Sequence, residues 1–112
     1  MSNSFIMERI VDVHSEKMRI KDKFIKTPIA NVNDDYLGLA WMRGEYKLHR
    51  HDRDELFLVM EGHLTIEVDG RVHELDPGMA ITISKGSAHR SRSEMMTLAA
   101  VFEPQGINIE FL

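Results

Sequence analysis

The stretch His49-Arg50-His51-Asp52-Arg53-Asp54-Glu55 places two histidines two residues apart and a glutamate shortly after them. In an extended strand, alternate side chains share one face about 6.6 Å apart, so both imidazoles can bind one metal ion roughly 2.1 Å from each ring nitrogen. A straight strand would carry Glu55 about 13 Å beyond His51. The aspartates favour a turn at 52–54, which would return Glu55 on the neighbouring antiparallel strand, facing the two histidines.

Strand and turn signals recur about every ten residues after this stretch. Residues 56–60 form a continuous apolar run, as in a strand that is covered on both faces. Residues 64–68 alternate between apolar and polar side chains, and Asp69-Gly70 predicts a two-residue hairpin. The spacing is typical of an all-β sandwich or barrel.

Two motifs in this region resemble those of the cupin superfamily. The first is GEYKLHRHDRDE at 44–55, followed after six residues by Gly62; the second runs from Gly78 through SKG at 84–86 to His89. The resemblance implies an all-β, cupin-type double-stranded β-helix, that is, a jelly-roll barrel of antiparallel strands. It also implies four metal ligands, which are His49, His51, Glu55 and His89.

The ends of the chain carry weaker patterns. Residues 5–7 and 9–13 read as short strands, and residues 37–42 read as a strand that enters the first motif. The apolar segments 98–102 and 107–112 either complete the barrel or add a strand to a partner. We therefore expect one cupin domain over 1–112, with N-terminal strands and loops in 1–36 and the core barrel in 37–102.

Four further side chains are candidates for contact with a substrate. Lys47 shares strand parity with the histidines and would hold an anionic substrate, unless a bulge after Gly44 turns it outward. Phe57 and Val59 share parity with Glu55, as cavity walls or as plain core. Trp41 either stacks on a ligand or packs in a core or interface.

Composition excludes several classes of protein. The chain has 112 residues, 43% of them apolar, which suits one compact domain. Its net charge of -4, with scattered basic residues, argues against a nucleic-acid surface, and no apolar run is long enough to span a membrane. With no cysteine, a cytoplasmic location is the default.

The apolar row Leu56, Leu58 and Met60 favours a homodimer.

Mixed nitrogen and oxygen ligation without thiolate suits one divalent transition metal ion per chain, whether iron, manganese, nickel, cobalt, copper or zinc. The sequence therefore predicts a small metal-binding protein with a small-molecule ligand. One hypothesis is a metal-dependent enzyme of the dioxygenase, isomerase or lyase type, acting on a small oxygen-bearing metabolite. The alternative is a protein that binds or senses a metal or metabolite without catalysis.

Overall fold

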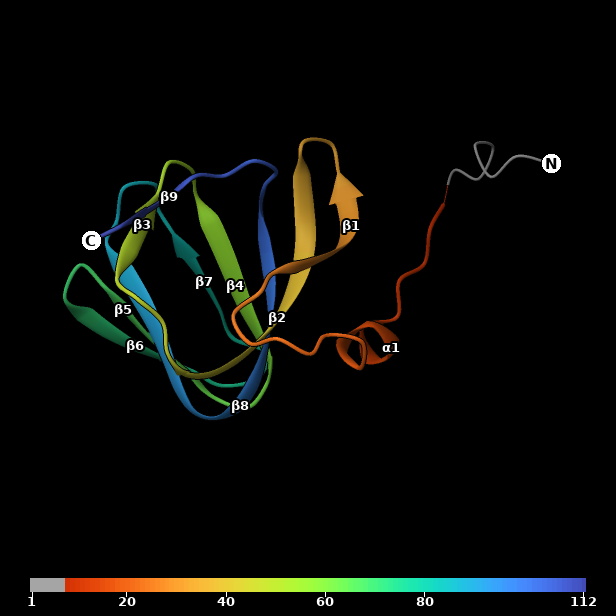
Figure 1. Ribbon diagram of the computed structural model, residues 1–112, viewed down its shortest axis with the longest axis horizontal. Coiled ribbons are helices and arrows are strands. Elements are labelled where there is room, and N and C mark those ends of the chain that lie inside the picture. The colour runs from red at the N-terminus through yellow and green to blue at the C-terminus, as the bar shows by residue number, and fades with distance from the viewer. Residues whose placement is uncertain (1–7) are drawn as a thin grey trace.

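The computed structural model describes residues 8–112, which form one short helix and nine strands that pair in antiparallel fashion (Figure 1). The predicted antiparallel all-β fold is confirmed. The elements are α1 (Val13–Lys17), β1 (Thr27–Val32), β2 (Asp35–Glu45), β3 (His49–His51), β4 (Glu55–Glu61), β5 (Leu64–Val68), β6 (Arg71–Leu75), β7 (Ala80–Ile83), β8 (His89–Pro104) and β9 (Ile109–Phe111).

The long strand β8 joins the two walls of the barrel. Its first part pairs with β5 on one side and, through His89, with β3 on the other. Its second part lies between β2 and β4. One wall therefore has the order β6-β5-β8-β3-β9 and the other has the order β7-β4-β8-β2-β1. This curled arrangement is the double-stranded β-helix that the two motifs imply.

The turn at 52–54 connects the two walls instead of closing a hairpin. Strand β3 pairs with β8 and β9, whereas β4 pairs with β7 and β8. The expectation that Glu55 returns on the strand next to the histidines is therefore wrong. Glu55 reaches them from the opposite wall, because a jelly roll crosses between its sheets where a meander would turn back.

The hairpin predicted at Asp69-Gly70 is confirmed. Asp69 and Gly70 both have positive φ, 48° and 81°, as a type I′ turn requires. Val68 then pairs with Arg71, and the register continues to Leu64 and Leu75. This hairpin extends the wall that carries the three histidines.

The core has two parts, one inside the barrel and one outside it. Alternate residues of β2, β4, β5 and β8 fill the interior, among them Met42, Val59 and Ile66. The outer face of β2 and β8 forms a second cluster around Leu39 and Leu98, which the N-terminal segment covers. No helix of the described residues is long and apolar enough to cross a membrane.

The N-terminal segment differs from the expected strands. Residues 5–7 lie outside the described residues. The strand expected at 9–13 is wrong, because the helix α1 begins at Val13. Asp12 caps this helix, its carboxylate accepting from the backbone N–H of His14 at 2.9 Å. At the other end of the chain, β9 pairs with β3, so the C-terminal segment closes this barrel.

Candidate metal centre

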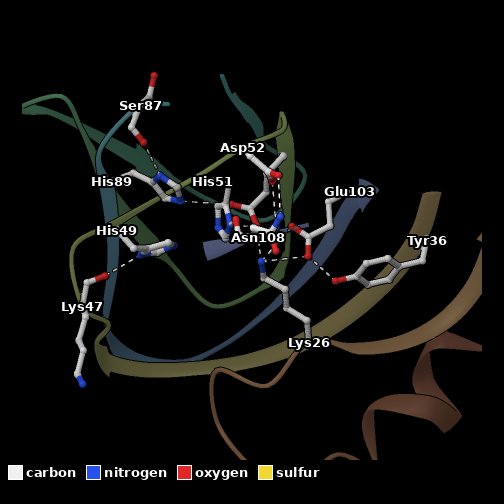
Figure 2. A network of polar contacts seen from close by, with 11 residues as sticks. Lys26, Tyr36, Lys47, His49, His51, Asp52, Ser87, His89, Glu103 and Asn108 are labelled. Atoms are coloured by element: carbon white, nitrogen blue, oxygen red, sulfur yellow. Dashed lines mark hydrogen bonds and ion pairs between the residues drawn. The ribbon is translucent and has the colours of Figure 1, made fainter. Parts of the chain in front are cut away.

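Three histidines from two adjacent strands meet inside the barrel (Figure 2). His49 and His51 lie on β3, and His89 begins β8 directly opposite His49. All three are buried, and each offers one ring nitrogen so that these atoms lie within 4.8 Å of one another. The i, i+2 spacing places the first two on one face of the strand, as expected, and strand pairing supplies the third.

Backbone carbonyls set the tautomer of each ring. Nδ1 of His49 lies 2.7 Å from the carbonyl oxygen of Lys47, Nδ1 of His51 lies 3.0 Å from that of Asn108, and Nδ1 of His89 lies 2.9 Å from that of Ser87. A carbonyl only accepts hydrogen bonds, so each Nδ1 donates. Each neutral ring therefore presents the lone pair of Nε2, which is the form that binds metal.

Glu55 adds a carboxylate to the same space. Its Oε1 lies 3.3 Å from Nε2 of His89 and its Oε2 lies 3.7 Å from Nε2 of His51. Within the part of the chain that the structure describes, Nε2 of His51, Nε2 of His89 and Oε1 of Glu55 are buried without a hydrogen-bond partner. Buried acceptors facing one another are costly unless a cation lies between them. The four side chains therefore fit a metal ion.

Protonation states also suit ligation. Burial lowers the pKa of His49 to about 4, and burial also lowers the pKa of His51. Burial would raise the pKa of Glu55, but its contacts with His89, Glu103 and Lys26 outweigh this and lower it. At neutral pH both of these imidazoles are uncharged and Glu55 is a carboxylate, as metal ligands must be.

A buried ion cluster lies directly behind Glu55. The ammonium of Lys26 forms an ion pair with Oε2 of Glu55 and contacts the two carboxylate oxygens of Glu103 at 3.1 and 3.0 Å. The hydroxyl of Tyr36 donates to Glu103. Burial, together with Glu55, raises the pKa of Glu103 to about 7. Burial would lower the pKa of Lys26, but the negative charges of Glu55 and Glu103 outweigh this effect and raise it.

The sequence reasoning missed this cluster. Glu103 shares strand parity with Ala99 and Val101, which are buried in the barrel, so a carboxyl group at an inward position was a usable signal. Lys26 and Tyr36 gave no such signal, because they come from a segment whose placement depends on the fold.

Two of the four predicted substrate residues lie elsewhere. The side chain of Lys47 points away from the histidines, and its ammonium lies 5.6 Å from the centre of the Phe111 ring (Figure 2). Its parity argument fails because residues 46–48 are not part of a strand. Trp41 lies on the outer face of β2, where its indole N–H donates to the carbonyl of Lys17 at 3.0 Å.

The interior also contains a small cavity beside the histidines, with a volume of about 60 Å³. Phe57 lines it, as one reading of its parity expected, whereas Val59 is fully buried in the core cluster. The remaining walls are mainly apolar, and His49, His89 and Lys26 lie at its boundary. An organic molecule here would meet His49 and His89 of the three-histidine group.

Comparison with known proteins agrees with this geometry. A family model of the cupin domain matches residues 42–102. The chain is 37% identical to the uncharacterized protein YdbB of Bacillus subtilis (strain 168) over 94 residues, which are 82% of this chain and 80% of that protein.

Solved structures show the same fold. A cupin-2 domain containing protein from Shewanella frigidimarina is similar with a TM-score of 0.83 and 28% identity, over 86% of this chain and 95% of that one. Hydroquinone 1,2-dioxygenase PnpCD, in complex with Cd²⁺ and 4-hydroxybenzonitrile, has a TM-score of 0.72 at 14% identity, over 81% of this chain and 70% of that one. The motifs, the barrel and these matches together show that the chain belongs to the cupin family.

Proposed function

We propose that the protein binds one divalent transition metal ion through Nε2 of each of the three histidines and through Glu55. The observation that carries this proposal is the convergence of buried acceptors without partners on one point. Three neutral imidazoles and one carboxylate leave a divalent ion with a net charge of about +1, and an octahedral ion keeps two open positions. The ligand types favour iron, manganese, nickel, cobalt, copper or zinc, with no thiolate to restrict the choice.

We further propose that the site is that of a metal-dependent enzyme acting on a small oxygen-bearing metabolite. A bound ion of this kind supplies Lewis-acid or oxygen-activating chemistry. The cavity supports the proposal because Phe57, Met42 and Tyr46 enclose a small apolar space next to His49 and His89. These side chains would hold the body of the substrate, exclude water and direct its oxygen atoms toward the histidines.

One of the solved structures with the same fold is a dioxygenase. Hydroquinone 1,2-dioxygenase PnpCD, in complex with 4-hydroxybenzonitrile, shares the barrel. Because the identity is low, this similarity guides the choice of test substrates and nothing more.

The first experiment is elemental analysis of protein purified without an affinity tag or chelator, beside a His51→Ala variant. We expect close to one equivalent of a transition metal in the wild type and a large loss in the variant. A variant with undiminished metal content would overturn the metal assignment.

The second experiment measures oxygen consumption by iron-loaded protein with dicarbonyls, catechols and thiol acids. Turnover of one substrate, absent in His89→Ala, is the expected result. If no compound consumes oxygen but one raises the melting temperature, the dioxygenase form of the enzyme proposal is wrong, and binding without catalysis gains support.

A further inference from the structure

Lys26 enters the barrel from a segment that precedes the strands of the cupin motifs. The backbone N–H of Phe24 donates to the carbonyl of Trp41 at 2.8 Å, which ties this segment to β2. Phe24 has a positive φ of 63°, and the chain then continues so that Phe24 and Lys26 both line the cavity. The ammonium therefore approaches Glu55 from outside the region that the family model matches, 42–102.

The contacts of Glu55 divide its two oxygens between different partners. Oε1 faces Nε2 of His89 at 3.3 Å and has no hydrogen-bond partner among the described residues. Oε2 forms the ion pair with Lys26 and lies 3.7 Å from Nε2 of His51. Glu55 is 1% exposed, and the ammonium occupies the oxygen that would otherwise be free to chelate.

Lys26 is in turn held in place by Glu103. The two carboxylate oxygens of Glu103 contact the ammonium at 3.0 and 3.1 Å, and Tyr36 donates to Glu103 from the far side. The ammonium is thus fixed between two carboxylates. If it moved away from either partner, a buried charge would be left unpaired. The contacts form a chain that runs from Tyr36 to Glu103, from Glu103 to Lys26, and from Lys26 to Glu55.

We propose that Lys26 is a positioning residue that restricts Glu55 to ligation through Oε1 alone and so keeps a coordination position open for substrate. The inference rests on the proposed metal site. A carboxylate that binds through both oxygens fills two positions, and three histidines would then leave an octahedral ion one open position instead of two.

The test compares two double variants that each remove one positive and one negative charge. K26M/E103Q removes the support of Glu55 and keeps the net charge of the chain unchanged. K17M/E61Q is the matched control, because Lys17 and Glu61 also join the N-terminal segment to β4 through an ion pair, at 2.5 Å. Circular dichroism and melting temperature first establish that each variant is folded.

The measurement is titration with Co²⁺, followed by the dissociation constant and by the visible absorption spectrum, which reports the identity and geometry of the ligands around the ion. We expect K26M/E103Q to give a changed spectrum, because both oxygens of Glu55 are then free to bind the ion. K17M/E61Q should retain the affinity and spectrum of the wild type, since Lys17 and Glu61 contact each other and not a candidate metal ligand. K26R, which keeps a cation on Oε2, should restore much of the wild-type spectrum.

A folded K26M/E103Q variant with the wild-type spectrum would overturn the proposal, whatever its melting temperature. If that variant does not fold, K26Q replaces it, with the same spectral criterion. Glu55→Gln separates the two levels of inference. If E55Q leaves Co²⁺ binding unchanged, the role of Lys26 is wrong while a three-histidine site stands; if the wild type binds no Co²⁺, the proposed metal site is wrong as well.

Discussion

The ring of His51 is oriented by Asn108, a residue 57 positions further along the chain. Nδ1 of His51 donates to the Asn108 carbonyl at 3.0 Å, whereas His49 and His89 each donate to a carbonyl only two residues away. Asp52 holds Asn108 in turn, accepting from its backbone N–H and its side-chain amide at 2.9 Å each. The C-terminal segment therefore takes part in the candidate site.

Substitution of Asp52 by alanine should weaken metal binding. Asn108 would lose both contacts that hold its carbonyl toward His51, and loss of such an outer contact typically costs about 10–100-fold in metal affinity. Competition with a chromophoric chelator would measure the change. Glu110→Ala is the control, because it removes an exposed ion pair with Arg50 on the same strand pairing. An equal loss of affinity in both variants would show that general loosening of β9, and not His51 orientation, is responsible.

The metal-free protein should lose stability between pH 6.5 and pH 4. Burial lowers the pKa of His49 from 6.5 to about 4. In this pH range His49 is therefore protonated in the unfolded chain and neutral in the folded chain. The contribution of His49 to the free energy of unfolding is complete above pH 6.5. It decreases by about 2–3 kcal/mol as the pH falls through this range. Urea unfolding at pH 7.5 and 4.5 would measure it, and His49→Asn should reduce the difference. A variant with the wild-type pH dependence would contradict the assignment.

Gly62→Ala should destabilise the fold strongly. Gly62 has a φ of 88°, and an added Cβ would lie 2.8 Å from the Met96 carbonyl oxygen and from Cα of Thr97. Backbone strain and this clash together should cost about 3 kcal/mol or more. Gly70→Ala, which has a similar φ but open space around it, should cost only the strain, roughly 1–2 kcal/mol. Thermal unfolding of both variants checks the difference, and equal losses would mean that close packing at Gly62 is not the cause.

The outer face of β4 and β8 is where we expect the second copy of a homodimer. Phe102 is 38% exposed and pairs across the strands with Leu56, and Met60 is also exposed on β4. Phe102→Arg should convert a dimer into monomers, because a charge cannot be buried there without a partner. Sedimentation equilibrium measures the mass, with Val72→Arg on the exposed β6 as control. A wild type that sediments as a single chain would end this expectation.

The His49-His51 pair and the Asp69-Gly70 hairpin were predictable from local patterns, whereas the resemblance to the cupin motifs added Glu55 and His89 as candidate ligands and implied the barrel. The i, i+2 histidines indicate a strand because only that geometry places both rings on one face. Asp69-Gly70 indicates its hairpin because the turn needs positive φ at both positions. Such signals depend on residues that are close in sequence, and they survive folding almost unchanged.

Lys26, Glu103 and Asn108 depended on contacts between distant segments. Lys47 lies two residues from His49, so its strand parity predicted an ammonium at the site. The break in strand structure at 46–48 turns it outward. Lys26 takes that place from 23 residues before His49, because β2 and β8 bring its segment against the barrel. Glu55 likewise arrives from the opposite wall, and no turn pattern distinguishes a crossover from a hairpin. Residue type, spacing and the two motifs thus indicate the candidate metal ligands, whereas strand pairing over long distances selects the charges that surround them.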